Sequence, residues 1–237
     1  MSTGIKLTKL LPKLHSPIRQ LLAVVEKEFR SELRQRVGLA LTFLSVVSVS
    51  FILALSLQGV ELSSELFAAL LWLALFFVLS PTLSRSFIAE AERGTYALLR
   101  SLTSIAALYW GKLIANSLFG IVASITSYAL FASFLRTPPV ANAAGLIILL
   151  LVAAFGFAAA LTLLSALLAA AQHRGMLLPI VALPILIPIL LFGINGTLAA
   201  LRDPTWEGIM PPLRLLIAYG GILSILGFWL SEWVWQE

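Results

Sequence analysis

The chain has 237 residues, of which 60% are hydrophobic and 11% are charged, and its mean hydropathy is +1.00. A soluble domain of this length carries about 25% charged residues, so the composition excludes a soluble globular protein and a disordered chain. Cysteine is absent, which excludes a disulfide scaffold and cysteine-ligated metal sites. The net charge of +5 does not indicate nucleic-acid binding, because eight of the 16 Lys and Arg lie in residues 1–36, before the first apolar run. That placement is an orientation signal of membrane proteins.

Long apolar runs predict six transmembrane helices. A helix needs about 20 residues to cross the hydrocarbon core, and runs without alternation are not barrel strands. We therefore expect an all-α fold, a polytopic membrane helical bundle in which residues 1–237 form a single transmembrane domain. The six predicted spans are residues 37–58, 66–83, 113–135, 141–171, 176–201 and 215–230.

The connections between these spans predict the orientation. With the N-terminus inside, 13 Lys and Arg lie on the cytoplasmic side and three, Arg136, Arg202 and Arg214, lie outside. This asymmetry places both termini in the cytoplasm. Lys112 stands at the inner edge of the third span, where we expect its ammonium to snorkel to water. The spans hold almost no other ionisable group, which argues against a proton- or sodium-coupled carrier.

Residues 1–36 predict a cytoplasmic amphipathic helix, with Ser16 as its N-cap and Pro17 as its first residue. Its apolar stripe faces away from most of its charges, and Glu26–Arg30 and Glu32–Arg36 are spaced to pair. We interpret it as a helix in the membrane interface; the alternative is a lead-in that only supplies positive charge. The stripe comprises Ile18, Leu21 or Leu22, Val25, Phe29 and Leu33.

Residues 85–112 form the longest cytoplasmic connection between spans. Mostly apolar residues, among them Ile88, Leu98 and Leu102, lie on one side at helical spacing, with charges on the other side, and Gly94 predicts a helix break. A helical pair that exposes its charges to the cytosol is typical of a docking surface for a soluble partner. The alternative is a solvated loop.

The chemistry of an enzyme is missing from the sequence. It contains no P-loop, no dinucleotide fingerprint and no HExxH motif, so we expect any ATP hydrolysis to occur in a separate subunit. The two histidines, His15 and His173, lie far apart and outside the spans. His173 is a candidate haem ligand or pH sensor, but a lone interfacial histidine is more often solvated.

The fifth span carries Pro179, Pro184 and Pro188, followed by Gly193. Each proline removes an amide donor, so we expect this helix to be kinked or broken. A hinge or gate lining a path is the functional interpretation; the alternative is that prolines are common in membrane helices. The fourth span is rich in Ala and Gly, which predicts a flat face for close packing.

Two segments resemble a known family. Residues 177–193 resemble the proline-rich fifth span of CcmB, the membrane subunit of the cytochrome c maturation ABC transporter. Residues 87–101 are similar to a cytoplasmic segment shared by CcmB and type-2 ABC permeases, although Ala97 replaces a frequent acid and Leu102-Thr103 replace a Ser-Pro turn. The resemblance implies an ATPase-coupling role for Glu90, Glu92, Arg93, Gly94, Thr95, Leu98 and Leu99.

The resemblance also implies a type-2 ABC permease-like fold in the bacterial cytoplasmic (inner) membrane. It implies work in haem export or haem delivery, with haem transported or held by a partner. The expected partners are a CcmA-like ATPase dimer, a second copy of the chain, CcmC-like and CcmD-like membrane proteins and membrane lipid. The alternatives are a type-2 permease that exports a lipid, polysaccharide or drug, and a membrane scaffold without transport.

Overall fold

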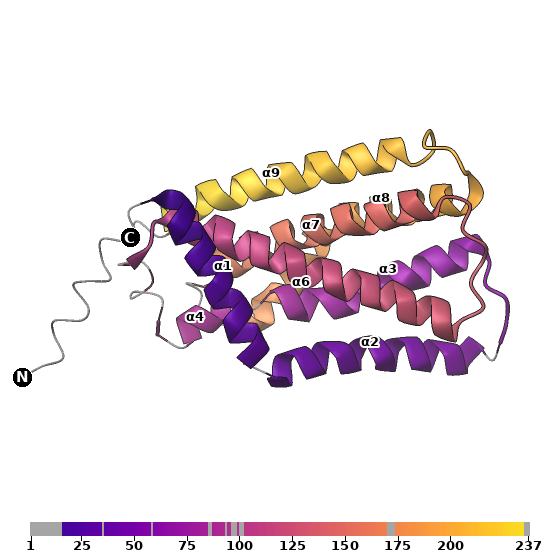
Figure 1. Ribbon diagram of the computed structural model, residues 1–237, viewed down its shortest axis with the longest axis horizontal. Coiled ribbons are helices and arrows are strands. Elements are labelled where there is room, and N and C mark those ends of the chain that lie inside the picture. The colour runs from indigo at the N-terminus through magenta and orange to yellow at the C-terminus, as the bar shows by residue number, and fades with distance from the viewer. Residues whose placement is uncertain are drawn as a thin grey trace, which may run out of the picture.

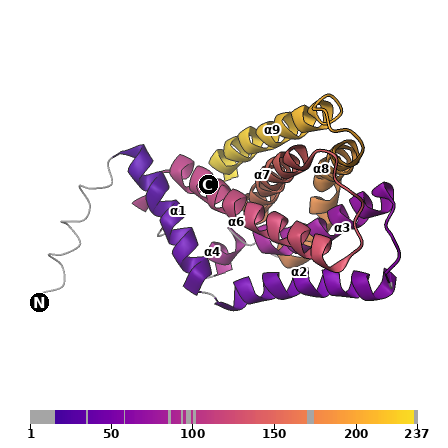
Figure 2. The ribbon, with the colours of Figure 1, turned by 45° about the vertical axis from the view of Figure 1, so that its right-hand side comes forward.

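The computed structural model describes residues 16–34, 36–57, 59–84, 87–92, 94–95, 99, 102–169 and 174–234. Within these ranges the chain forms helices and connecting loops, with no strand. The long helices lie side by side in one bundle, and α1 lies across one end of it (Figure 1, Figure 2). The helices are α1 (Pro17–Arg34), α2 (Arg36–Leu57), α3 (Ser64–Leu83), α4 (Ile88–Glu92), α6 (Ile105–Phe134), α7 (Ala143–Leu168), α8 (Arg174–Arg202) and α9 (Met210–Val234).

Five of the six predicted spans are confirmed as helices that are long and apolar enough to cross a membrane. They are α3, α6, α7, the Ile180–Arg202 part of α8 and the Met210–Glu232 part of α9. The chain is therefore a multi-pass membrane protein. The first predicted span corresponds to α2, which has 22 residues, but its apolar part with described side chains, Phe43–Leu57, is shorter than a span. The sixth crossing stays a prediction.

The third predicted span, residues 113–135, corresponds to the longer helix α6, and the expectation that Lys112 snorkels to water is wrong. Helix α6 begins eight residues earlier, at Ile105, where the Ser104 hydroxyl accepts a hydrogen bond from the Ala107 amide at 3.2 Å. Lys112 therefore lies in the third turn of α6, and it is 0% exposed. It does not snorkel, because its ammonium finds carboxylates inside the protein.

Helix α7 is the centre of the bundle. It packs against α6, α8 and α9, and the small residues between Ala153 and Ala160 are buried, which confirms the predicted close-packing face. The helix is shorter than predicted: Asn142 caps it by accepting a hydrogen bond from the Gly145 amide at 2.8 Å.

The fifth predicted span is a single helix. Although it contains three prolines, α8 continues from Arg174 to Arg202 and is not broken. Its role as a hinge stays a prediction.

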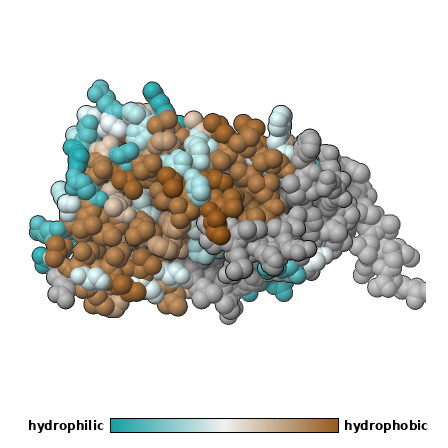
Figure 3. Space-filling model, turned by 180° about the vertical axis from the view of Figure 1, so that it is seen from behind, coloured by the Kyte–Doolittle hydropathy of each residue, from teal (hydrophilic) through white to brown (hydrophobic). Residues whose placement is uncertain are grey.

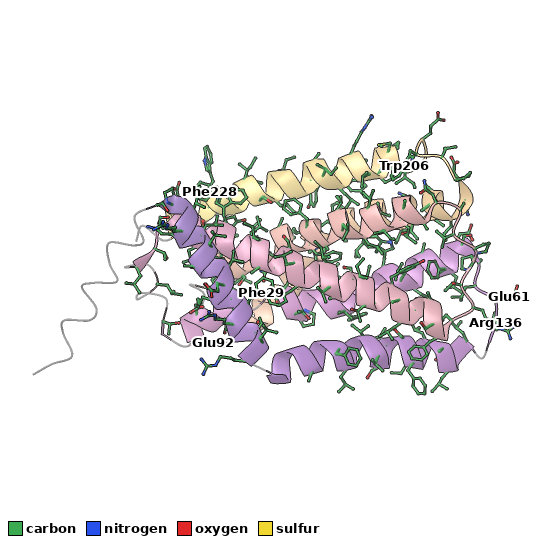
Figure 4. The ribbon with its side chains drawn as sticks, viewed as in Figure 1. Phe29, Glu61, Glu92, Arg136, Trp206 and Phe228 are labelled. Atoms are coloured by element: carbon green, nitrogen blue, oxygen red, sulfur yellow. The ribbon has the colours of Figure 1, made fainter. Side chains whose placement is uncertain are left out.

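The two ends of the bundle differ. We call the end that carries α1, α4 and the first residues of α6 the α1 end, and the opposite end, with the connections around Glu61, Arg136 and Trp206, the loop end (Figure 4). At the loop end an ion pair between Arg202 and Glu65 joins α8 to α3. From behind, the coloured surface between the ends is largely hydrophobic, as a lipid-facing belt requires (Figure 3).

Candidate functional site

The short helix α4 is closed by a glycine C-cap at the α1 end. Gly94 has a φ of +65°, and the Thr95 amide donates a hydrogen bond to the Glu90 carbonyl at 3.2 Å. This is the Schellman arrangement, in which a left-handed residue lets the chain turn back onto the helix. The predicted helix break at Gly94 is confirmed.

The start of the same segment is attached to the centre of the bundle. The amides of Phe87 and Ile88 both donate to the hydroxyl of Ser165 in α7, at 2.8 and 3.4 Å. Because these amides precede or begin α4, they have no helical acceptor of their own. One buried hydroxyl on α7 therefore fixes where α4 enters the bundle.

Four charged residues from three helices meet beneath α4, and we call them the charge cluster: Lys27 and Glu28 of α1, Glu90 of α4 and Lys112 of α6. The Lys112 ammonium lies 2.7 Å from Glu28 Oε1 and 3.5 Å from Glu90 Oε1. Lys27 lies 3.0 Å from Glu28 Oε1 and also pairs directly with Glu90. Two cations and two anions thus alternate, and the cluster is neutral.

Burial makes this cluster costlier to break than a surface ion pair. The side chains of Lys112, Glu90 and Glu28 are 0%, 7% and 13% exposed. A buried charge is tolerated only when partners replace water, and Lys112 has two carboxylates together with the ring of Phe87, whose centroid is 5.1 Å from its ammonium. Removing one partner leaves another buried charge uncompensated.

The surroundings of Lys27 and Glu90 keep both side chains charged. Burial raises the pKa of Glu90, but Lys112, Lys27 and Thr95 outweigh this effect and leave the pKa below its ordinary value. Burial likewise lowers the pKa of Lys27, but the carboxylates of Glu28 and Glu90 raise it above its ordinary value. Both groups are therefore ionised at neutral pH.

The predicted coupling residues do not share one surface. Glu90 points into the charge cluster, so the expectation that this segment turns its charges to the cytosol is wrong for Glu90. Glu92 and Gly94 are exposed, while Thr95 and Leu99 are half-buried. The Thr95 hydroxyl donates to the Glu90 carboxylate. The predicted residues Arg93 and Leu98 lie outside the described residues.

The gate residues predicted in the fifth span also have different surroundings. A Cβ on Gly193 would collide with the indole ring of Trp72, whose Nε1 donates to the Thr197 hydroxyl at 2.8 Å. Gly193 is thus a close contact between α8 and α3. Pro184 is exposed and Pro188 is half-buried.

One hydrogen bond between helices lies beside a proline. Pro188 has no N–H, so the carbonyl of Pro184 loses its helical donor. At the next carbonyl, that of Ile185, the hydroxyl of Tyr219 in α9 donates at 2.9 Å. Pro179 lies in the helical backbone of α8, and its side chain lies outside the described part.

The charge cluster and Asn195 were missed by sequence reasoning. Leu21, Val24 and Glu28 recur at the spacing of one helix face, and that face, with Val24 against Gly111, packs on α6. Glu28 on this otherwise apolar face was the signal in the sequence that could have predicted a buried ion pair.

Asn195 lies exposed on α8 in line with Ile187 and Leu191, where lipid would not solvate an amide.

The described residues hold no group of three His, Cys, Asp or Glu that could ligate a metal ion. His15 and His173 lie outside them, so the candidate ligand role of His173 stays untested.

Comparison with known proteins identifies the family. The family described as CcmB protein matches residues 19–227. The chain belongs to the CcmB family. It is also similar to "Heme exporter protein B" of Bradyrhizobium diazoefficiens, with 27% identity over 208 residues, which covers 86% of this chain and 92% of that protein. The resemblance read from residues 87–101 and 177–193 is therefore confirmed, and the match includes the charge cluster.

Proposed function

We propose that this CcmB-family chain is the membrane permease subunit of an ABC transporter for cytochrome c maturation. It acts in haem export or haem delivery, and a separate ATPase dimer powers it. The name of the similar protein, "Heme exporter protein B", supports the substrate. The absence of nucleotide-binding motifs from the sequence supports an external energy source. A second copy of the chain and CcmC-like and CcmD-like proteins complete the proposed complex.

The proposed topology has six spans, with both termini in the cytoplasm of a bacterial inner membrane. Helix α2, 22 residues long, is the sixth crossing, since an apolar helix of that length reaches across the hydrocarbon core. The α1 end is then cytoplasmic, which agrees with the basic residues of residues 1–36. This plan is that of a type-2 ABC permease.

The charge cluster is the observation that carries the coupling proposal. Movement of the ATPase is received by the segment of residues 85–112, which we call the coupling segment, at the exposed Glu92 and Gly94. The other proposed contacts of this segment with the ATPase are Arg93, Thr95, Leu98 and Leu99. Glu90 passes it to Lys112, because separating buried opposite charges is costly, and α4 therefore moves α6 and α1 with it. The hydrogen bonds to Ser165 provide a second connection, to α7.

Helix α8 is the proposed gate. Gly193 and the Trp72–Thr197 hydrogen bond hold its loop-end half against α3. The half with Pro179, Pro184 and Pro188 lacks three helical donors and bends more easily. The exposed amide of Asn195, in line with Pro184, supports a face that lines a path or meets protein rather than lipid.

Co-purification with the ATPase tests the coupling role. We expect Glu92→Ala with Gly94→Ala to lose ATPase association several-fold, because the first change removes an exposed charge and the second strains a positive φ. The matched control is Glu61→Ala with Gly59→Ala at the loop end, since Gly59 also has a positive φ, +78°. Equal ATPase retention in the two variants would reject the coupling role.

Haem-stained cytochrome c tests the substrate. We expect the coupling variant to lose mature cytochrome c in cells while the loop-end control keeps it. Normal maturation in a strain without this chain would point instead to a permease for another substrate.

A further inference from the structure

Helix α1 has three faces with different surroundings. Its inner face, with Val24 and Glu28, packs on α6. On one side of that face lies the apolar flank, Ile18, Leu22 and Leu33, whose residues are 70%, 58% and 61% exposed. On the other side lies the basic flank, which comprises Arg19, Lys27, Arg30 and Arg34.

Two contacts orient these flanks relative to the bundle. Gln20, next to the basic flank, accepts a hydrogen bond from the Ser104 amide at the start of α6, at 3.1 Å. On the apolar side the ring of Phe29 lies 4.7 Å from that of Phe119, which is halfway along α6 (Figure 4). The apolar flank thus faces the level of the lipid belt, and the basic flank faces the end of the molecule.

The exposed charges of α1 are mostly positive. Glu28 points inward to Lys112, whereas Arg19, Arg30 and Arg34 are exposed. Glu26 is the exposed acid, and it pairs with Arg30 at 2.5 Å. The outward surface therefore keeps a net positive charge.

A groove of about 520 Å³ runs along the basic flank. Its lining includes the cations Lys27, Arg30 and Arg34, and one acid, Glu26, which pairs with Arg30. A concave surface with cations on its wall fits an anionic group of limited size.

We propose that the outward surface of α1 binds anionic phospholipid headgroups in the leaflet at the α1 end. The apolar flank lies among the acyl chains, and the basic flank contacts the phosphates, as in interfacial helices that select anionic membranes. A soluble partner is a weaker fit, because it could cover the basic flank but not an apolar flank at the level of the lipid belt. The proposal concerns the chain alone and does not depend on the ATPase.

Lipid retention by the purified full-length chain tests the proposal. The probe is a mixed micelle containing equal amounts of phosphatidylglycerol and phosphatidylcholine. Native mass spectrometry then measures the ratio of the two lipids that the chain retains. We expect wild type to retain phosphatidylglycerol preferentially, and less so as salt rises. Arg19→Gln with Arg34→Gln should lower that preference about thirty-fold, from the contribution of two surface charges.

The control variant, Arg136→Gln with Arg214→Gln, removes two exposed arginines from the loop end and should keep the preference. Arg19→Lys with Arg34→Lys should also keep it, since headgroup attraction depends mainly on charge, whereas a folding defect at these positions would lower it as well. An unchanged preference after Arg19→Gln with Arg34→Gln overturns the proposal, as does an equal loss in the control. Loss of ATPase association with unchanged lipid retention would assign the flank to the soluble partner and would also overturn it.

Discussion

Replacing Lys112 by methionine removes the most buried charge of the cluster while keeping a side chain of similar shape. The change leaves Glu28 and Glu90, which are 13% and 7% exposed, with Lys27 as their shared cation. Breaking a buried ion pair by removing one partner costs about 3–5 kcal/mol. Because Lys27 already contacts both carboxylates, we expect a loss near the lower end, about 3 kcal/mol of unfolding free energy.

Equilibrium unfolding of the full-length chain in mixed micelles measures this loss. The control is Arg30→Met, which breaks the exposed Glu26–Arg30 pair, whose side chains are 61% and 75% exposed respectively, and should cost no more than about 0.5 kcal/mol. Lys112→Met combined with Glu28→Gln should recover part of the loss, with a coupling energy of about 1–3 kcal/mol. The reasoning is refuted if Lys112→Met costs no more than Arg30→Met.

Three further results are expected. Gly193→Ala should destabilise the protein by about 1–3 kcal/mol in the same assay, because the added methyl meets the ring of Trp72, whereas Gly221→Ala, with open space around it, should be neutral or stabilising. Thr197→Val should cost about 1–3 kcal/mol, since it leaves the buried Trp72 Nε1 without the 2.8 Å acceptor; no loss would contradict that role. The folded pKa of Glu90 lies below its ordinary 4.5, so its contribution is complete above pH 4.5 and lost as pH falls through the folded pKa. The free energy of unfolding, measured as pH is lowered, should therefore depend less on pH in Glu90→Gln than in wild type. The same pH dependence in both proteins would contradict the ion pairing.

The pKa of Lys27 is raised, so its contribution to stability depends on pH in the opposite direction. Its contribution is complete below its ordinary 10.5 and is lost as pH rises through the higher folded pKa. The ion pair between Lys27 and Glu90 is therefore expected to persist across the neutral pH range.

The sequence by itself determined the class of protein, because the length and hydropathy of a run are local properties. About 20 consecutive apolar residues can satisfy their backbone in lipid only as a helix. The cap at Ser16, whose hydroxyl accepts a hydrogen bond from the Arg19 amide at 3.4 Å, and the turn at Gly94 were predictable for the same reason, since both depend on neighbouring residues alone. The segment match of residues 177–193 likewise led to the family before any contact between helices was considered.

Only the tertiary structure decided which charges are inside. Lys112 lies 84 residues from Glu28 and 22 residues from Glu90 in the sequence. No local pattern indicates that α1 and α4 meet at the same turn of α6. The snorkelling of Lys112 was wrongly predicted for this reason: a lysine near an apolar run extends to water when water is its best solvent, but not when two carboxylates replace that water. Gly193 is a similar case, since its need for a hydrogen in place of a side chain comes from Trp72 on another helix.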